Sequence, residues 1–209
     1  MSDLSHNRSW FRWWLPTIVA FALIAIAEHI GVLSFARPYV APVYFLYAPF
    51  LWQRMLKSSD VGLTWPTKGW GLTLVSGAVI FVGFYLFTRY LLWGPWPGTP
   101  DSVWLRLTNE ILFAALPEEL FFRGWMQPAA ERMMPSARWQ LFGITLTGGI
   151  VLTAGAFALV HLAAQPVARL SVFFPGLWFG ILRRESGSIV PAVAVHALSN
   201  VLMAAATGY

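Results

Sequence analysis

The chain has 209 residues, of which 57% are hydrophobic and 11% are charged, whereas an ordinary soluble domain is roughly 45–50% apolar and about 25% charged. This composition predicts a membrane protein, and no hydrophilic stretch is long enough for a separate soluble domain. The chain has no cysteine, which excludes disulfides, thiolate catalysis and cysteine-based metal sites. The net charge of +5 comes from basic residues at the ends of apolar segments, which argues against nucleic-acid binding.

Seven apolar segments follow one another, so we expect an all-α, polytopic membrane bundle of about seven transmembrane helices, within a range of six to eight. They cover residues 13–36, 38–52, 70–93 and 103–125, a stretch ending near 164, and residues 170–182 and 188–209. The first is expected to be an uncleaved span, since a bilayer requires about 20 apolar residues. The second is short and contains Pro38 and Pro42, so we expect it to be tilted, broken or only partly inserted.

The distribution of basic residues predicts the orientation of this bundle. Two arginines precede the first segment, and arginines and lysines recur in alternate loops, which predicts a cytoplasmic N-terminus. A short, loop-poor, multi-pass chain favours the inner membrane of a bacterium. We expect residues 1–209 to form one domain, with accessory helices over about 13–93 and a core over about 103–209 that carries three polar runs.

The first polar run, Glu118, Glu119 and Arg123, lies inside the fourth segment. A charged group at the centre of a bilayer costs about 2.5–3.5 kcal/mol on insertion scales, so such groups normally pair with one another or bind a substrate. Glu119 and Arg123 are four residues apart and are expected to form an ion pair on one helix face. Glu118 points about 100° away and stays available. Alternatively, all three are solvated at a helix end among the lipid headgroups.

Two more polar runs lie in later apolar segments. His161 follows Phe157 by four residues among small residues that allow close helix packing. Taken alone, such a histidine is typical of a hydrogen-bonded packing residue. His196 and Asn200 are also four residues apart, which directs an imidazole and a carboxamide to the same side of a helix. The alternative for this pair is a hydrogen bond between helices, worth under about 1 kcal/mol on average in membranes.

Together these side chains supply the groups that peptide hydrolysis requires. Glu118 can act as a general base toward a water, and His161 can hold that water or share its proton. His196 and Asn200 can donate hydrogen bonds to the oxyanion that forms when water attacks an amide. We therefore predict that the four side chains meet in one polar cavity within the membrane.

In order, the three runs resemble the signature of the CPBP family of intramembrane proteases, which includes CAAX prenyl endopeptidases and bacterial Abi-type proteins. The family pattern is Glu-Glu-x-x-x-Arg, then Phe-x-x-x-His, then His-x-x-x-Asn. The matching residues are Glu118, Glu119 and Arg123, then Phe157 and His161, then His196 and Asn200. The resemblance covers about residues 110–203, and the N-terminal half is similar only as generic membrane helices.

The resemblance implies an intramembrane endopeptidase that cleaves a membrane-associated protein or peptide, without a cofactor. The implied substrates are a prenylated C-terminal CAAX peptide, a leader peptide or a C-terminal sorting tail. By this resemblance, Glu118 is the general base and His161 is its partner on the water. His196 and Asn200 form the oxyanion site. The resemblance implies structural support of the site by three other matched residues, Glu119, Arg123 and Phe157.

Zinc is an alternative, because Glu118, His161 and His196 can in principle form a Glu-His-His site with one open position. The helical HExxH run is absent, and Asn200 suits an oxyanion better than zinc, so we expect catalysis without metal. Two other functions stay open. One is a non-catalytic binding or partner protein of the same family, and the other is a small proton-linked transporter. The polar path of such a transporter would use Glu28, His29, Arg89, Arg106 and Glu110.

Depth in the membrane constrains the cavity. If the span that carries His161 began at Leu141, His161 would lie about 30 Å along it, too far from Glu118. We therefore predict a later start, near Gly148 and Gly149, with residues 135–147 partly interfacial. We also predict that the helix bearing Glu118 continues to about residue 132.

Overall fold

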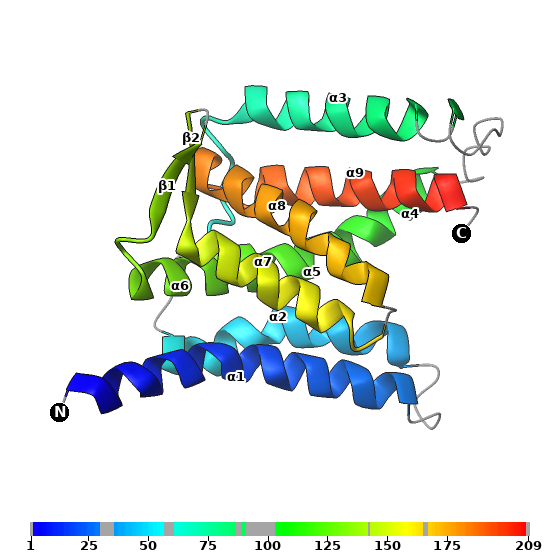
Figure 1. Ribbon diagram of the computed structural model, residues 1–209. Helices are drawn as coiled ribbons and strands as arrows, with labels where there is room; N and C mark the ends of the chain where they lie inside the picture. The colour runs from blue at the N-terminus through cyan, green and yellow to red at the C-terminus, as the bar shows by residue number, and fades with distance from the viewer. Residues whose placement is uncertain are drawn as a thin grey trace.

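The computed structural model describes the chain as a set of helices with one short hairpin (Figure 1). The described residues are 2–29, 36–56, 61–86, 89–90, 103–141, 143–164 and 167–207. The first three helices are α1 (Ser2–His29), α2 (Arg37–Leu56) and α3 (Trp70–Leu86).

One unbroken helix runs from Val103 to Met133 and carries the paired glutamates. In two stretches it widens from α to π geometry, because the N–H groups of Leu116 and Gln127 donate to carbonyls five residues earlier. Its parts are α4 (Val103–Glu110), η3 (Ile111–Ala115, π), α5 (Leu116–Glu119), η4 (Leu120–Met126, π) and α6 (Gln127–Met133).

A hairpin and three further α-helices complete the described chain. They are β1 (Arg138–Leu141), β2 (Ile144–Thr147), α7 (Gly148–His161), the short 3₁₀ helix η5 (Val167–Val172), α8 (Phe173–Ser186) and α9 (Val190–Thr207). Gly187 ends α8 in the left-handed conformation, with φ of 74°, which glycine adopts at low cost. The chain can therefore turn within three residues from α8 into α9.

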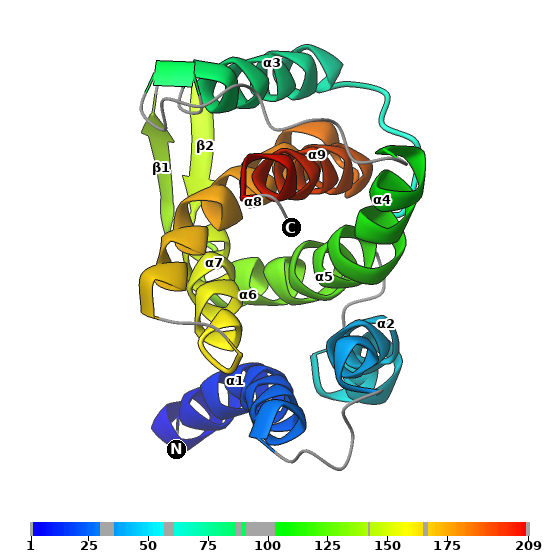
Figure 2. The ribbon, with the colours of Figure 1, turned by 90° about the vertical axis from the view of Figure 1, so that its right-hand side faces the viewer.

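The helices are arranged in layers that place the Val103–Met133 helix between α2 and α9 (Figures 1 and 2). Helix α1 packs against α2 and α7, while α8 packs between α7 and α9. Helix α3 lies on the outer side of α9 (Figure 2). The three polar runs, on α5–η4, α7 and α9, therefore come from neighbouring helices.

An aromatic cluster fixes the Val103–Met133 helix against the two N-terminal helices. Phe45 of α2 lies 5.0 Å from the ring centroid of Phe121 and 5.3 Å from that of Phe122. Trp13 of α1 and Trp125 belong to the same fully buried cluster. Such rings bury large apolar areas and stabilise a packed helix more than smaller side chains do.

All seven predicted segments contain helix. The second segment, expected to be tilted, broken or only partly inserted, is not broken, and its tilt and insertion stay predictions. Helix α2 is continuous over 20 residues, although Pro42 and Pro49 lie inside it. Each proline removes one helical hydrogen bond. Helix α2 packs along both α1 and the Val103–Met133 helix, and this packing keeps α2 helical on either side of the prolines.

The chain is mostly helical, as the all-α prediction expects, and the described residues also contain one short hairpin. Its strands pair antiparallel, with Gln140 opposite Thr145, and the two side chains share a hydrogen bond of 2.9 Å. Gly143 supplies the turn with φ of 79°. The isoleucine, leucine and threonines of β2 favour strand over helix locally, a preference that hydropathy does not reveal.

In the described part of the chain, no helix combines the length and the apolar composition that crossing a membrane requires. The predicted crossings and the cytoplasmic N-terminus therefore stay predictions. The division into accessory helices over 13–93 and a core over 103–209 also stays a prediction.

Both predictions drawn from depth are confirmed. Helix α7 begins at Gly148, capped by the Thr147 side chain, which accepts a hydrogen bond from the N–H of Ile150 at 3.2 Å. The same hydroxyl donates to Glu131 of α6 at 2.8 Å. The Val103–Met133 helix continues past Arg123 as predicted. His161 thus lies about 20 Å along its helix rather than about 30 Å.

The first turn of α7 yields a stability prediction. A Cβ on Gly149 would lie 2.4 Å from Cγ and 2.7 Å from the backbone N of Glu131, so Gly149→Ala must push α7 away from α6. We expect it to lower the free energy of unfolding by about 1–3 kcal/mol, as overpacking does. The measurement is thermal unfolding of the purified full-length chain.

Gly155→Ala is the matched control on the same helix, because a Cβ there meets no atom within 4 Å. It should leave stability unchanged or raise it by about 0.5–1 kcal/mol, since alanine favours a helix over glycine. Equal effects of the two substitutions would contradict the close α6–α7 contact.

Candidate active site

A cavity of about 600 Å³ lies where the Val103–Met133 helix, α7, η5, α8 and α9 converge. The polar side chains that line it include all four predicted catalytic residues, and three further polar residues line it as well. The predicted four are Glu118, His161, His196 and Asn200, and the others are Glu110, Arg169 and Ser199. The cavity is within the size range of small-ligand sites in proteins.

The predicted ion pair between Glu119 and Arg123 is present and fully buried. Nη1 of Arg123 lies 3.1 Å from Oε1 of Glu119, and both side chains have 0% exposure. Nη2 donates to the carbonyl of Gly176 in α8 at 3.0 Å. The guanidinium also lies over the ring of Phe157, 4.4 Å from its centroid. Arg123 thereby links three helices.

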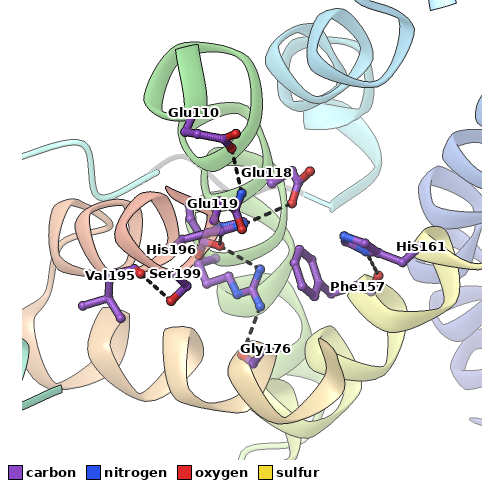
Figure 3. A network of polar contacts seen from close by, with 11 residues as sticks. Glu110, Glu118, Glu119, Phe157, His161, Gly176, Val195, His196 and Ser199 are labelled. Carbon is purple, nitrogen blue, oxygen red and sulfur yellow. Dashed lines mark hydrogen bonds and ion pairs between the residues drawn. The ribbon is translucent and has the colours of Figure 1, made fainter. Parts of the chain in front are cut away.

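His196 binds the same buried carboxylate from the opposite helix (Figure 3). Its Nδ1 lies 2.9 Å from Oε1 of Glu119, and its Nε2 lies 3.8 Å from Oε2 of Glu118. The ring stacks on Phe179, with centroids 4.8 Å apart and an angle of 16°. An ionised carboxylate only accepts hydrogen bonds, so Nδ1 is the donor in the contact with Glu119.

The two adjacent glutamates differ in their environment. Glu119 holds the buried pair, whereas the Glu118 side chain is 17% exposed and lines the cavity. Its Oε2 has no hydrogen-bond partner among the described residues. Glu118 therefore contributes to the cavity wall a carboxylate whose buried Oε2 makes no hydrogen bond among the described residues.

His161 lies beyond the Phe157 ring from His196 (Figure 3). Its Nδ1 is 2.8 Å from the carbonyl oxygen of Phe157. A carbonyl can only accept, so Nδ1 carries the proton and Nε2 of the neutral ring is an acceptor. His161 shares the cavity with Glu118, and Phe157 fixes its ring from one side at a centroid distance of 4.5 Å.

Asn200 is held by a residue that the site prediction does not include. Its Nδ2 donates to Oε2 of Glu110 at 3.0 Å. In the sequence, Glu110 belongs to the alternative transport path, where it can also pair with Arg106 four residues earlier. On an uninterrupted α-helix, Glu110 and Glu118 would be roughly 80° apart. The π turn adds one residue and rotates the following chain back by about 100°, which leaves the two roughly 20° apart.

The alternative zinc set does not fit this geometry. Within the described ranges, no three His, Asp or Glu side chains are grouped as metal ligands. Glu118 and His196 approach each other, but His161 is turned toward the Phe157 carbonyl beyond the aromatic ring. Catalysis without metal stays a prediction.

The buried ion pair yields a second stability prediction. Arg123→Ala would leave the Glu119 carboxylate buried without its cation, which costs about 3–5 kcal/mol in measured cases. We expect a large fall in the melting temperature of the purified chain. Arg138→Ala is the control, since Arg138 is exposed on β1. Equal melting temperatures for the two variants would show that the pair does not stabilise the fold.

Comparison with known proteins places this site in a family. The model of a family described as type II CAAX prenyl endopeptidase, Rce1-like, matches residues 100–202, which contain all three polar runs. No curated protein and no solved structure matches the chain. The match favours a peptidase over the transporter alternative. Over residues 100–202, which contain the whole candidate site, the chain is similar to the Rce1-like family of type II CAAX prenyl endopeptidases.

Proposed function

We propose that this chain is an intramembrane endopeptidase that hydrolyses a peptide bond of a membrane-associated, prenylated protein or peptide. One observation carries the proposal. The carboxylate of Glu118, whose Oε2 makes no hydrogen bond among the described residues, lines a cavity of about 600 Å³ together with two histidines and Asn200. The neighbouring Glu119 is neutralised by Arg123. In this arrangement Glu119 has a structural role, and Glu118 is left for the chemical role.

In the proposed reaction, Glu118 acts as the general base. It takes one proton from a water as the water oxygen attacks the carbonyl carbon of the scissile peptide bond. Nε2 of His161 accepts a hydrogen bond from the same water and orients it. When the tetrahedral intermediate collapses, the C–N bond breaks and Glu118 returns the proton to the leaving nitrogen. Apart from Glu118 and His161, the step needs only water and the substrate.

The oxyanion of the intermediate is assigned to His196 and Asn200. Since Nδ1 of His196 donates to Glu119, donation to an oxyanion requires a second proton, on Nε2. Asn200 uses one N–H for Glu110 and has its second N–H for the oxyanion. Loss of one such donor typically costs about 10²–10³-fold in rate.

A membrane location is supported by the surface of the molecule. Large apolar side chains are highly exposed on several helices, among them Phe50 (75%) on α2, Leu74 (70%) on α3 and Phe174 (70%) on α8. Extended apolar surface of this kind marks contact with lipid or with another protein. Proteins of the matched family are membrane proteins. We therefore propose that lipid covers these faces.

The substrate class follows from the family description, CAAX prenyl endopeptidase. We propose a farnesylated C-terminal CAAX peptide as the first substrate to assay. An internally quenched version reports cleavage directly. A leader peptide and a C-terminal sorting tail, attached to the same fluorophore pair, are the comparison substrates.

Glu118→Gln should abolish cleavage of the farnesylated peptide by the purified full-length chain in proteoliposomes. The amide keeps the size of the side chain but takes up no proton, so we expect kcat to fall by about 10²–10⁴-fold. His161→Ala should lower kcat in the same direction. The assay is the rise in fluorescence with time.

Glu185→Gln is the matched control, because Glu185 lies on α8 and does not line the cavity. It should cleave at the wild-type rate. A Glu118→Gln protein that melts at the wild-type temperature and still cleaves at the wild-type rate would refute the assignment of the base.

A further inference from the structure

The hydrogen bond between Asn200 and Glu110 determines which end of the Asn200 amide faces the cavity wall. An ionised carboxylate accepts hydrogen bonds and cannot donate them. Only the Nδ2 end of the amide can therefore face Glu110, at the observed 3.0 Å. Without such a partner, an asparagine side chain can rotate and present its oxygen instead. An oxygen in that position would repel an oxyanion.

The π turn Ile111–Ala115 places Glu110 where it can make this contact. It returns Glu110 to the face of the helix that carries Glu118, and both side chains line the same cavity. The Glu110 carboxylate thus lies next to Asn200, on the face of α9 that carries both His196 and Asn200. Two carboxylates of one helix thereby fix the two polar residues of α9, Glu119 through His196 and Glu110 through Asn200.

We propose that Glu110 is a positioning residue of the reaction, which acts by holding the Asn200 amide with an N–H toward the oxyanion. The inference rests on the proposed function. Glu110 itself touches no reacting atom. Its role is to remove the rotational freedom of a donor before the transition state forms, which is where preorganised donors gain their effect.

Glu110 can act by orienting the Asn200 amide or by its negative charge, and these two roles predict opposite effects of substitution. A negative charge near a developing oxyanion is unfavourable, so the benefit of Glu110 must come from its acceptor oxygen. Gln in its place keeps an acceptor oxygen and removes the charge, whereas alanine removes both. If orientation is the role, Glu110→Gln stays active and Glu110→Ala does not.

The test is a double-mutant cycle with the farnesylated, internally quenched peptide and the full-length chain in proteoliposomes. The variants are Glu110→Ala, Glu110→Gln, Asn200→Ala and the Glu110→Ala, Asn200→Ala double substitution. Asn109→Ala is the control, since Asn109 is exposed on the same helical turn. Melting temperatures are measured for each variant.

We expect Glu110→Ala to lower kcat by about 10–10²-fold while KM changes by less than about twofold. Glu110→Gln should keep most of the wild-type kcat. In the Asn200→Ala background, Glu110→Ala should cause no further loss, because the residue acts through Asn200.

Three results would overturn the inference: additive losses in the cycle, a Glu110→Gln variant as impaired as Glu110→Ala, or an unchanged kcat for Glu110→Ala. The Glu118→Gln variant in the same assay separates this inference from the proposed function. Full activity of Glu118→Gln refutes the proposed function. An inactive Glu118→Gln with an additive cycle refutes only the role of Glu110.

Discussion

The buried carboxylate of Glu119 is the group on which the arrangement of the site depends. It accepts hydrogen bonds from Arg123 on its own helix and from His196 on α9. Arg123 in turn donates to the carbonyl of Gly176 on α8. A carboxylate in this position is tolerated only when it is paired, because burying it alone costs several kcal/mol. The same contacts that neutralise Glu119 therefore fix the positions of three helices around the cavity.

This constraint explains how two adjacent glutamates take different roles. Glu119 faces the packed interior, and Glu118, rotated by about 100° on the helix, lines the cavity. Phe157 contacts Arg123, His161 and His196, so one aromatic ring supports the cation and both imidazoles. In the proposed reaction, Glu118 and His161 both hold the water. His196 and Asn200 of α9 donate hydrogen bonds to the oxyanion.

Spacing within one helix made part of this site predictable. The i,i+4 rule predicted the Glu119–Arg123 pair, and the depth argument predicted that α7 starts at Gly148. Contacts between helices were beyond such rules. The bond from His196 to Glu119 depends on how α9 packs, and the role of Glu110 depends on a π turn that has no sequence signature. Hydropathy likewise missed the hairpin, because strand and helix differ in period and not in mean hydropathy.

In the proposed function, Glu118 activates the water that cleaves peptide bonds of membrane proteins. Its most direct test is to compare the protein termini of the membrane proteome between cells that carry the wild-type chain and cells that carry Glu118→Gln at equal abundance. If Glu118 is the general base, one or a few membrane proteins should have a new terminus only in wild-type cells. Identical termini in both strains would contradict it.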